Sequence, residues 1–124
     1  LFTKCLLFAK VNLPNDEFRL FQRLFEMMQP QLIQPDLLIY LHAPVNKLQE
    51  NIKKRNRSYE QNIKDDYLFE IQQTYTHYIK QHPLRTLFVD ASNVDFLHNE
   101  QHLNIILEAL ERDYDEGQHV ITFP

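Results

Sequence analysis

Apolar side chains recur every three or four positions in several stretches of the chain, which is the spacing of amphipathic helices. Residues 15–28 give the clearest example, because their apolar positions fall on one helical face after a possible cap at Asn15 or Asp16. The same spacing predicts helices at residues 2–11, from Pro44 into the basic run after Ile52, around 67–79, and from about 100 to 112. We therefore expect five helices.

Two short apolar runs have a different pattern. "LLIYL", residues 37–41, and "TLFVD", residues 86–90, are nearly continuous in apolar character, as in strands that are buried on both faces of a parallel sheet. A helical crossover separates them, so they should be parallel. Two parallel strands cannot cover themselves. The chain is therefore expected to be an incomplete α/β domain, with about two strands and five helices.

The last eleven residues, 114–124, form an acidic segment that we expect to be loosely held, although "VITF" within it could be a further strand. Overall the chain has 13 Lys+Arg against 17 Asp+Glu and a net charge of -4, which argues against a general nucleic-acid binder. The apolar run "CLLFA" is far too short to cross a membrane. A soluble, cytoplasmic protein is the expectation.

Cysteine and glycine content narrows the chemistry further. Cys5 is the single cysteine, which excludes an internal disulfide and a cysteine-based zinc site. Gly117 is the single glycine, so these 124 residues contain no glycine-rich phosphate loop. His98 and His102 are spaced for a metal, but no third ligand is convincingly placed, and no metal site is predicted.

The basic run "IKKRNRSYEQNI", residues 52–63, is the strongest candidate for chemistry. Arg55 and Arg57 carry planar, permanently charged donors that match phosphate oxygens. A solvated helix end is the alternative, since cations favour a helix C-terminus. Glu60 could accept a hydrogen bond from a sugar hydroxyl, or it could pair with one of the arginines.

Three further residues are weaker candidates. Phe8 could stack on a base or could belong to the core. Asp95 and Phe96 follow the second strand, where α/β proteins bind ligands beyond the carboxyl ends of parallel strands. The alternative for this pair is a loop aspartate beside a core residue.

Taken in order, "LFAK", "PDLLIYLHAPVNKLQENIKKRNRSYEQNI", "DDYLFEIQQTYTHYI" and "FVDASNVDF" resemble the C-terminal part of the deoxynucleoside kinases, which phosphorylate deoxyadenosine, deoxyguanosine or deoxycytidine. The resemblance covers residues 1–113, with a lid at 53–63 of the form Arg-x-Arg-x-x-Glu. It implies a P-loop-type α/β fold. The family's phosphate-binding loop, with the ligands of Mg²⁺, and its Glu-Arg-Ser motif, with the general base, are expected before Leu1.

The resemblance also implies roles. Arg55 and Arg57 match lid arginines that contact the donor phosphates and the transferring group. Glu60 matches the lid glutamate that holds the sugar 3'-hydroxyl, and Phe8 matches an aromatic that stacks over the acceptor base. Asp95 and Phe96 match the loop that cradles the adenine of ATP, partly through backbone groups.

Three residues depart from the family pattern. Asn51 stands where many members have an arginine, Tyr59 replaces an acidic residue, and Lys4 replaces a base-reading aspartate. The implied function is transfer of the γ-phosphoryl of ATP to a deoxynucleoside 5'-hydroxyl, with purine nucleosides favoured and the 124 residues inactive alone. Family members are commonly dimers, so a homodimer is allowed. A thymidylate-kinase-like nucleotide kinase and a non-catalytic helical interaction domain are the alternatives.

Overall fold

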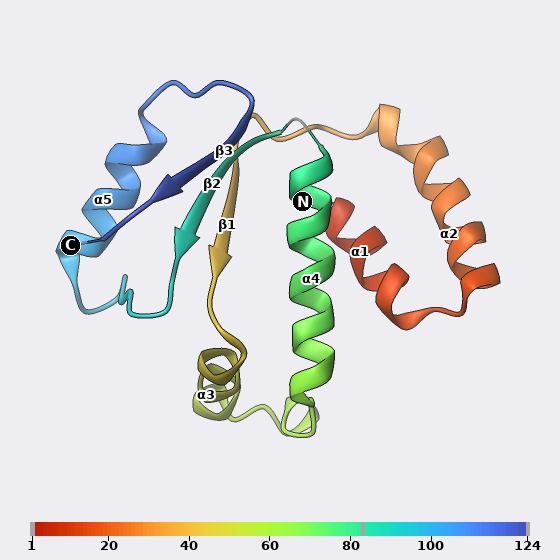
Figure 1. Cartoon of the computed structure of the whole chain (residues 1–124), viewed down its shortest axis with the longest axis horizontal. Helices are drawn as coiled ribbons and strands as arrows, with labels where there is room; N and C mark the ends of the chain where they lie inside the picture. Colours follow the sequence, from red (N-terminus) through yellow and green to blue (C-terminus); the bar gives the residue numbers. More distant parts are fainter. Residues whose placement is uncertain (1, 83, 124) are drawn as a thin grey trace.

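The computed structural model describes residues 2–82 and 84–123. Within them, the β-strands form one sheet and the α-helices lie around it (Figure 1). The helices are α1 (Thr3–Asn12), α2 (Asn15–Met28), α3 (Val45–Arg55), α4 (Asp65–Gln81) and α5 (Glu100–Leu110), and short 3₁₀ turns occupy Gln29–Gln31 and Ser58–Glu60. The strands are β1 (Leu38–His42), β2 (Arg85–Asp90) and β3 (Gly117–Ile121). The five predicted helices and the α/β class are confirmed.

The three strands are parallel and lie in the order β1-β2-β3, so β2 is the central strand of the described sheet. One face packs against α5: Leu87 and Val89 of β2 are fully buried with Ala109 and Ile121. The opposite face carries an aromatic row, in which the rings of Tyr40 and Phe88 lie 5.3 Å apart. This alternation follows from the period of two along a strand.

β3 is a third strand beside the two that the apolar runs predicted, and it includes the start of "VITF", which the sequence allowed as a further strand. β3 begins at Gly117, whose φ of 107° is open to glycine and strained for other residues, and it pairs with β2 along its length. Ile121 is buried in the core, whereas Val120 is 67% exposed. An edge strand with one buried face needs few apolar residues, which is why composition alone underestimated this segment.

The N-caps of α2 and α3 differ from the residues predicted from the sequence. Pro14, rather than Asn15 or Asp16, is the N-cap of α2, and no side chain caps that helix; Asn15 and Asp16 lie in its first turn. Pro44 is the N-cap of α3 and does not lie inside its first turn. None of the helices in residues 2–82 and 84–123 has both the length and the apolar character needed to cross a bilayer.

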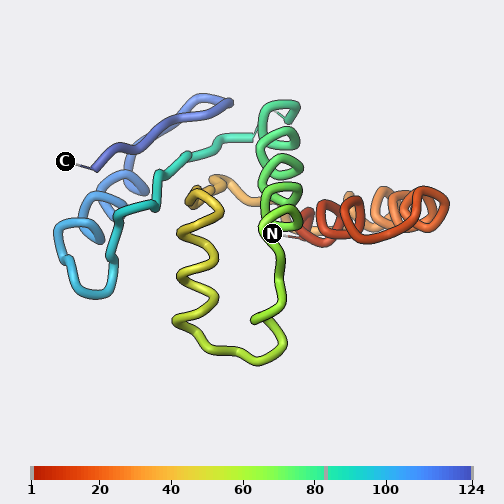
Figure 2. The backbone as a smooth tube through the Cα atoms, turned by 60° about the horizontal axis from the view of Figure 1, so that its bottom comes forward, coloured from red at the N-terminus to blue at the C-terminus, as the bar shows by residue number. Residues whose placement is uncertain are grey.

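The helices form two groups about the sheet. α5 lies beside β2 and β3, while α4 lies on the other side and contacts α1 and α3 (Figure 1). α1 and α2 form a pair beyond α4, in which Phe2 stacks on Phe25 with ring centroids 5.5 Å apart. The segment from α3 to α4 makes a long excursion from the sheet, best seen in Figure 2.

Candidate functional site

The candidate residues of the lid and of the loop after β2 leave the sheet at one edge. β1 and β2 are parallel and end in register, with His42 opposite Asp90. The chain after β1 enters α3 and residues 56–64, and the chain after β2 enters the loop 91–99, so both extend from the carboxyl edge (Figure 1). This edge is where parallel α/β sheets place their ligands.

The lid, residues 53–63, changes direction sharply where α3 ends. Asn56 has a left-handed backbone with φ of 53°, and its N–H reaches the carbonyls of Ile52 and Lys53. An asparagine at this helix end is a common terminator because it tolerates that conformation. Arg57 returns to an extended backbone, so the two arginines do not continue along one helical face.

Two glutamines fix the shape of the lid. Gln61 donates to the carbonyls of Ile52, at 3.3 Å, and Arg57, at 3.1 Å, which ties the outgoing chain to α3. Gln49 donates to the carbonyl of Ile63 and to the carboxylate of Asp65, both at 2.9 Å, which ties the end of the lid to the start of α4. The lid is therefore a defined loop with internal support.

Arg55 and Glu60 meet inside this loop. The Nη2 of Arg55 donates to the Oε2 of Glu60 at 2.8 Å. The glutamate side chain is only 15% exposed, whereas that of Arg55 is 52% exposed. Among the described residues, the Oε1 of Glu60 is buried without a hydrogen-bond partner. A buried carboxylate oxygen in that state is a site where a donor would be favourable.

Arg57 differs from Arg55. Its side chain is exposed, and its carbonyl accepts hydrogen bonds from the backbone N–H of Glu60 and from Gln61. In the part of the chain that the structure describes, its guanidinium forms no ion pair. Arg57 thus presents its five donors to solvent at the same edge.

Phe8 lies on another wall, where α1 faces α4. Its ring meets Tyr75 edge-on, with centroids 6.2 Å apart, and the Nζ of Lys4 lies 5.9 Å from its centroid. Tyr75 in turn stacks on Tyr40 at 6.0 Å. Phe8 is thus connected to β1 of the sheet through Tyr75 and Tyr40, and none of these ring contacts involves a residue of the lid.

A largely apolar cavity of about 380 Å³ adjoins this wall and is lined in part by Lys4, Tyr40 and Tyr75. Burial, followed by the nearby charges of Tyr40 and Cys5, raises the pKa of Tyr75 to about 12. Burial also raises the pKa of Tyr40. The two hydroxyls therefore stay neutral over the ordinary pH range, as expected for groups held in an apolar place.

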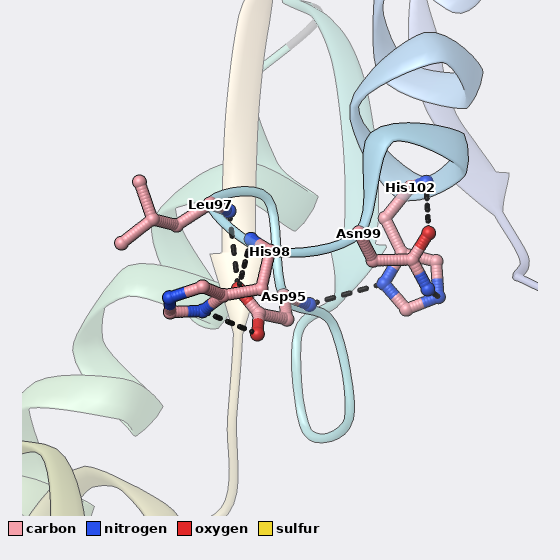
Figure 3. A network of polar contacts seen from close by, with 5 residues as sticks. All are labelled: Asp95, Leu97, His98, Asn99 and His102. Atoms are coloured by element: carbon pink, nitrogen blue, oxygen red, sulfur yellow. Dashed lines mark hydrogen bonds and ion pairs between the residues drawn. The ribbon is translucent and has the colours of Figure 1, made fainter.

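The loop after β2 is organised by Asp95 (Figure 3). Its Oδ1 accepts from the backbone N–H groups of Leu97, at 3.1 Å, and His98, at 3.0 Å, while its Oδ2 lies 3.0 Å from the Nδ1 of His98. The hydrogen bond from the His98 backbone is the largest of several effects that lower the pKa of Asp95. Both carboxylate oxygens are thus used to shape the loop.

His102 and Asn99 complete this network. The Nδ1 of His102 accepts from the backbone N–H of Asp95 at 3.0 Å, and Asn99 caps α5 by accepting from the N–H groups of Gln101 and His102. The ring of Phe96 meets that of Phe123 edge-on at 6.4 Å. Sequence reasoning missed Asn99, His102 and Phe123 as partners of the loop; only Asn99 had a local signal, as a residue type typical of an N-cap.

Of the predicted site residues, Arg55 and Glu60 contact each other, and Asp95 contacts backbone groups of its own turn. Phe8 lies apart from both, against Tyr75 of α4. Across residues 2–82 and 84–123 no group of three His, Cys, Asp or Glu side chains is arranged to hold a metal ion. His98 and His102 serve the loop instead.

Comparison with known proteins decides the family. The family model described as deoxynucleoside kinase matches residues 1–113. The chain belongs to the deoxynucleoside kinase family. The resemblance inferred from the lid and strand motifs is confirmed. β3 lies beyond the matched residues.

Two relatives in this kinase family share part of their length with the chain. Deoxyguanosine kinase from Bacillus subtilis (strain 168) is 28% identical over 102 residues, which cover 78% of this chain and 49% of the relative. Deoxyadenosine kinase from Lactobacillus acidophilus (strain ATCC 700396 / NCK56 / N2 / NCFM) is 26% identical over an alignment of 125 residues. That alignment covers 89% of this chain and 58% of the relative. The chain spans about half the length of these curated relatives.

Proposed function

We propose that this chain is the lid-bearing part of an ATP-dependent deoxynucleoside kinase that transfers the γ-phosphoryl group to the 5'-hydroxyl of a deoxynucleoside. The observation that carries the proposal is the pair of Arg55 and Glu60, held in a defined lid at the carboxyl edge of the sheet in a chain of this family. Such an edge receives nucleotides in parallel α/β proteins.

Arg55 and Arg57 are proposed to neutralise charge on the phosphates. Phosphoryl transfer spreads negative charge over the oxygens of the moving group, and positioned guanidinium groups stabilise that charge. Arg57 is exposed at the lid, and the Arg55 side chain is about half exposed. Both side chains have room to turn towards a ligand.

Glu60 is proposed to hold the sugar of the acceptor. Its Oε2 is occupied by Arg55, and its Oε1 is buried without a partner among the described residues. A sugar 3'-hydroxyl would supply the missing donor at that oxygen. The same glutamate would then connect the acceptor to Arg55, which contacts the phosphates.

Phe8 is proposed to stack on the acceptor base, and the loop of Asp95 and Phe96 is proposed to receive the adenine of ATP. The aromatic surroundings of Phe8 support the first role, since stacking tolerates any base face. The second is supported by the internal hydrogen bonds of Asp95, which fix the backbone groups that would read the adenine. A purine acceptor is favoured because the two relatives are named for deoxyguanosine and deoxyadenosine.

The lid and the loop are proposed to receive ATP, whereas the described residues contain no group of three His, Cys, Asp or Glu side chains that could hold Mg²⁺. No step is therefore assigned to the metal in this chain. The 124 residues also contain no Gly-x-x-x-x-Gly-Lys motif, so they are proposed to be inactive alone. A cytoplasmic location and a homodimeric state are further parts of the proposal.

The test is an acceptor panel. The full-length enzyme that carries this segment is expected to convert deoxyguanosine or deoxyadenosine to the monophosphate in the presence of Mg-ATP, faster than deoxycytidine or thymidine. Phosphorylation of thymidine monophosphate, with no activity on nucleosides, would instead support a thymidylate-kinase-like enzyme. Product formation by the 124-residue polypeptide would refute its proposed inactivity.

A further inference from the structure

Phe123 connects the end of β3 to the loop that follows β2. Its ring meets Phe96 edge-on, with centroids 6.4 Å apart and planes at 68°, and it meets His102 in the same way at 5.4 Å and 69°. Edge-on pairs of this kind are favourable and fix the relative orientation of the rings. One aromatic side chain therefore contacts both the loop and the first turns of α5.

The two partners of Phe123 belong to the same hydrogen-bonded unit. The Nδ1 of His102 accepts a hydrogen bond from the backbone N–H of Asp95 at 3.0 Å (Figure 3). Phe96 is the next residue in the chain. The backbone at Asp95 and Phe96 is thus held on one side by the imidazole of His102. Phe123 packs against that imidazole and against the Phe96 ring.

The position of Phe123 depends on long-range strand pairing. β3 pairs in parallel with β2, with Val89 opposite Ile121, and Ile121 is buried in the core. Phe123 follows two residues later. A cavity of about 530 Å³ lies between the loop residues Ser92, Asn93 and Val94 and the end of β3, and Phe123 is one of its walls.

We propose that Phe123 is a positioning residue for the donor nucleotide: carried by β3, it fixes the loop of Asp95 and Phe96 in the shape that receives the adenine of ATP. This inference rests on the proposed kinase function. It assigns a role to the segment after residue 113, which lies outside the match to the family. Phe123 acts through the loop, whereas the loop itself contacts the base.

The test uses the full-length enzyme that carries this segment, with Phe123→Ala. KM for ATP is expected to rise about tenfold, while KM for the deoxynucleoside changes by less than about twofold, because small displacements of positioning groups have large effects on the ligand they align. The advantage of ATP over UTP as donor should fall, since the uracil base makes fewer of the contacts that the loop provides. ATP affinity from calorimetry should weaken in parallel.

Two variants control for a general loss of structure. Phe123→Tyr keeps the ring and should behave like the wild type, since Phe123 is only partly buried. Phe69→Ala removes an exposed phenylalanine of α4 and should leave both KM values unchanged. If Phe123→Ala does not fold, Phe123→Leu keeps the apolar volume and should show the same selective rise in KM for ATP.

The outcomes are separable. A lower melting temperature with KM for ATP and the ATP/UTP ratio unchanged, or an equal rise in both KM values, would overturn the positioning role. A wild-type enzyme that binds ATP but phosphorylates no nucleoside would refute the proposed function, and the calorimetric comparison would still decide the role of Phe123. A wild-type enzyme that does not bind ATP would overturn both.

Discussion

Arg55 and Glu60 are bonded to each other, with the guanidinium Nη2 2.8 Å from the carboxylate Oε2. The left-handed turn at Asn56 makes this contact possible, because it folds residues 57–60 back towards the end of α3. The pair is partly exposed, so its own contribution to stability is small. Its importance is geometric: it holds one oxygen of Glu60, while the other, Oε1, is buried without a partner among the described residues.

Replacing Glu60 tests the use of that second oxygen. Glu60→Gln in the full-length enzyme should raise KM for the deoxynucleoside about tenfold, because a hydrogen bond to a charged acceptor is lost. A substrate without the 3'-hydroxyl should bind the wild type and the variant about equally weakly. Glu50→Gln, at an exposed glutamate of α3 that pairs with Lys47, is the matched control and should keep the preference for the 3'-hydroxyl. An undiminished preference in Glu60→Gln would contradict the assignment.

The backbone at Asn56 gives a prediction about stability. Asn56→Gly should leave the free energy of unfolding unchanged or raise it slightly, whereas Asn56→Val should lower it by about 1–2 kcal/mol, because a β-branched residue is strained at φ of 53°. Denaturant titration gives both values. Asn46→Val, on the exposed side of α3, is the control, since valine and asparagine have similar helix propensity. Equal values for the two Asn56 variants would show that the turn is absent in solution.

Tyr75 gives a prediction about alkaline pH. Its pKa rises from 10.0 to about 12 on folding, so the folded protein retains the proton that the unfolded chain loses first. The contribution of Tyr75 to stability is therefore complete below pH 10 and decreases as the pH rises from 10 to about 12. Urea unfolding across this range should show a flatter decline for Tyr75→Phe than for the wild type. Tyr59→Phe, at an exposed tyrosine, should follow the wild type; a Tyr75→Phe curve parallel to the wild type would argue against the shift.

Local patterns were enough to predict most of the framework. The apolar steps of α2 and α4 and the continuous runs of β1 and β2 each show in a window of a few residues, and the structure has these elements where they were expected. The position of the basic run at the end of α3 followed from the same reasoning. The alternatives for Glu60, an ion pair or a sugar contact, could not be separated by spacing; the structure contains the ion pair, and the sugar contact remains a proposal.

Features that depend on distant residues were not predictable in this way. Ile121 is the single buried residue of β3, so the local sequence gives little indication that this strand pairs with β2. The contact between Phe123 and Phe96 depends on that pairing. The contact between His102 and the backbone of Asp95 likewise depends on how the loop closes. The capping of α2 was predicted wrongly because proline can precede a helix without any side-chain cap.

The most direct test of the account compares two neighbouring cations of the lid. Single-turnover transfer of the γ-phosphoryl from Mg-ATP to a deoxynucleoside is measured in the full-length enzyme for Arg55→Ala and for Lys54→Ala, since both residues are exposed in the last turn of α3. Arg55→Ala should slow transfer by about 10²-fold or more, as expected for a group that neutralises charge on the moving phosphoryl, and Lys54→Ala should have little effect. Equal, small effects of the two substitutions would mean that the basic run is only a solvated helix end.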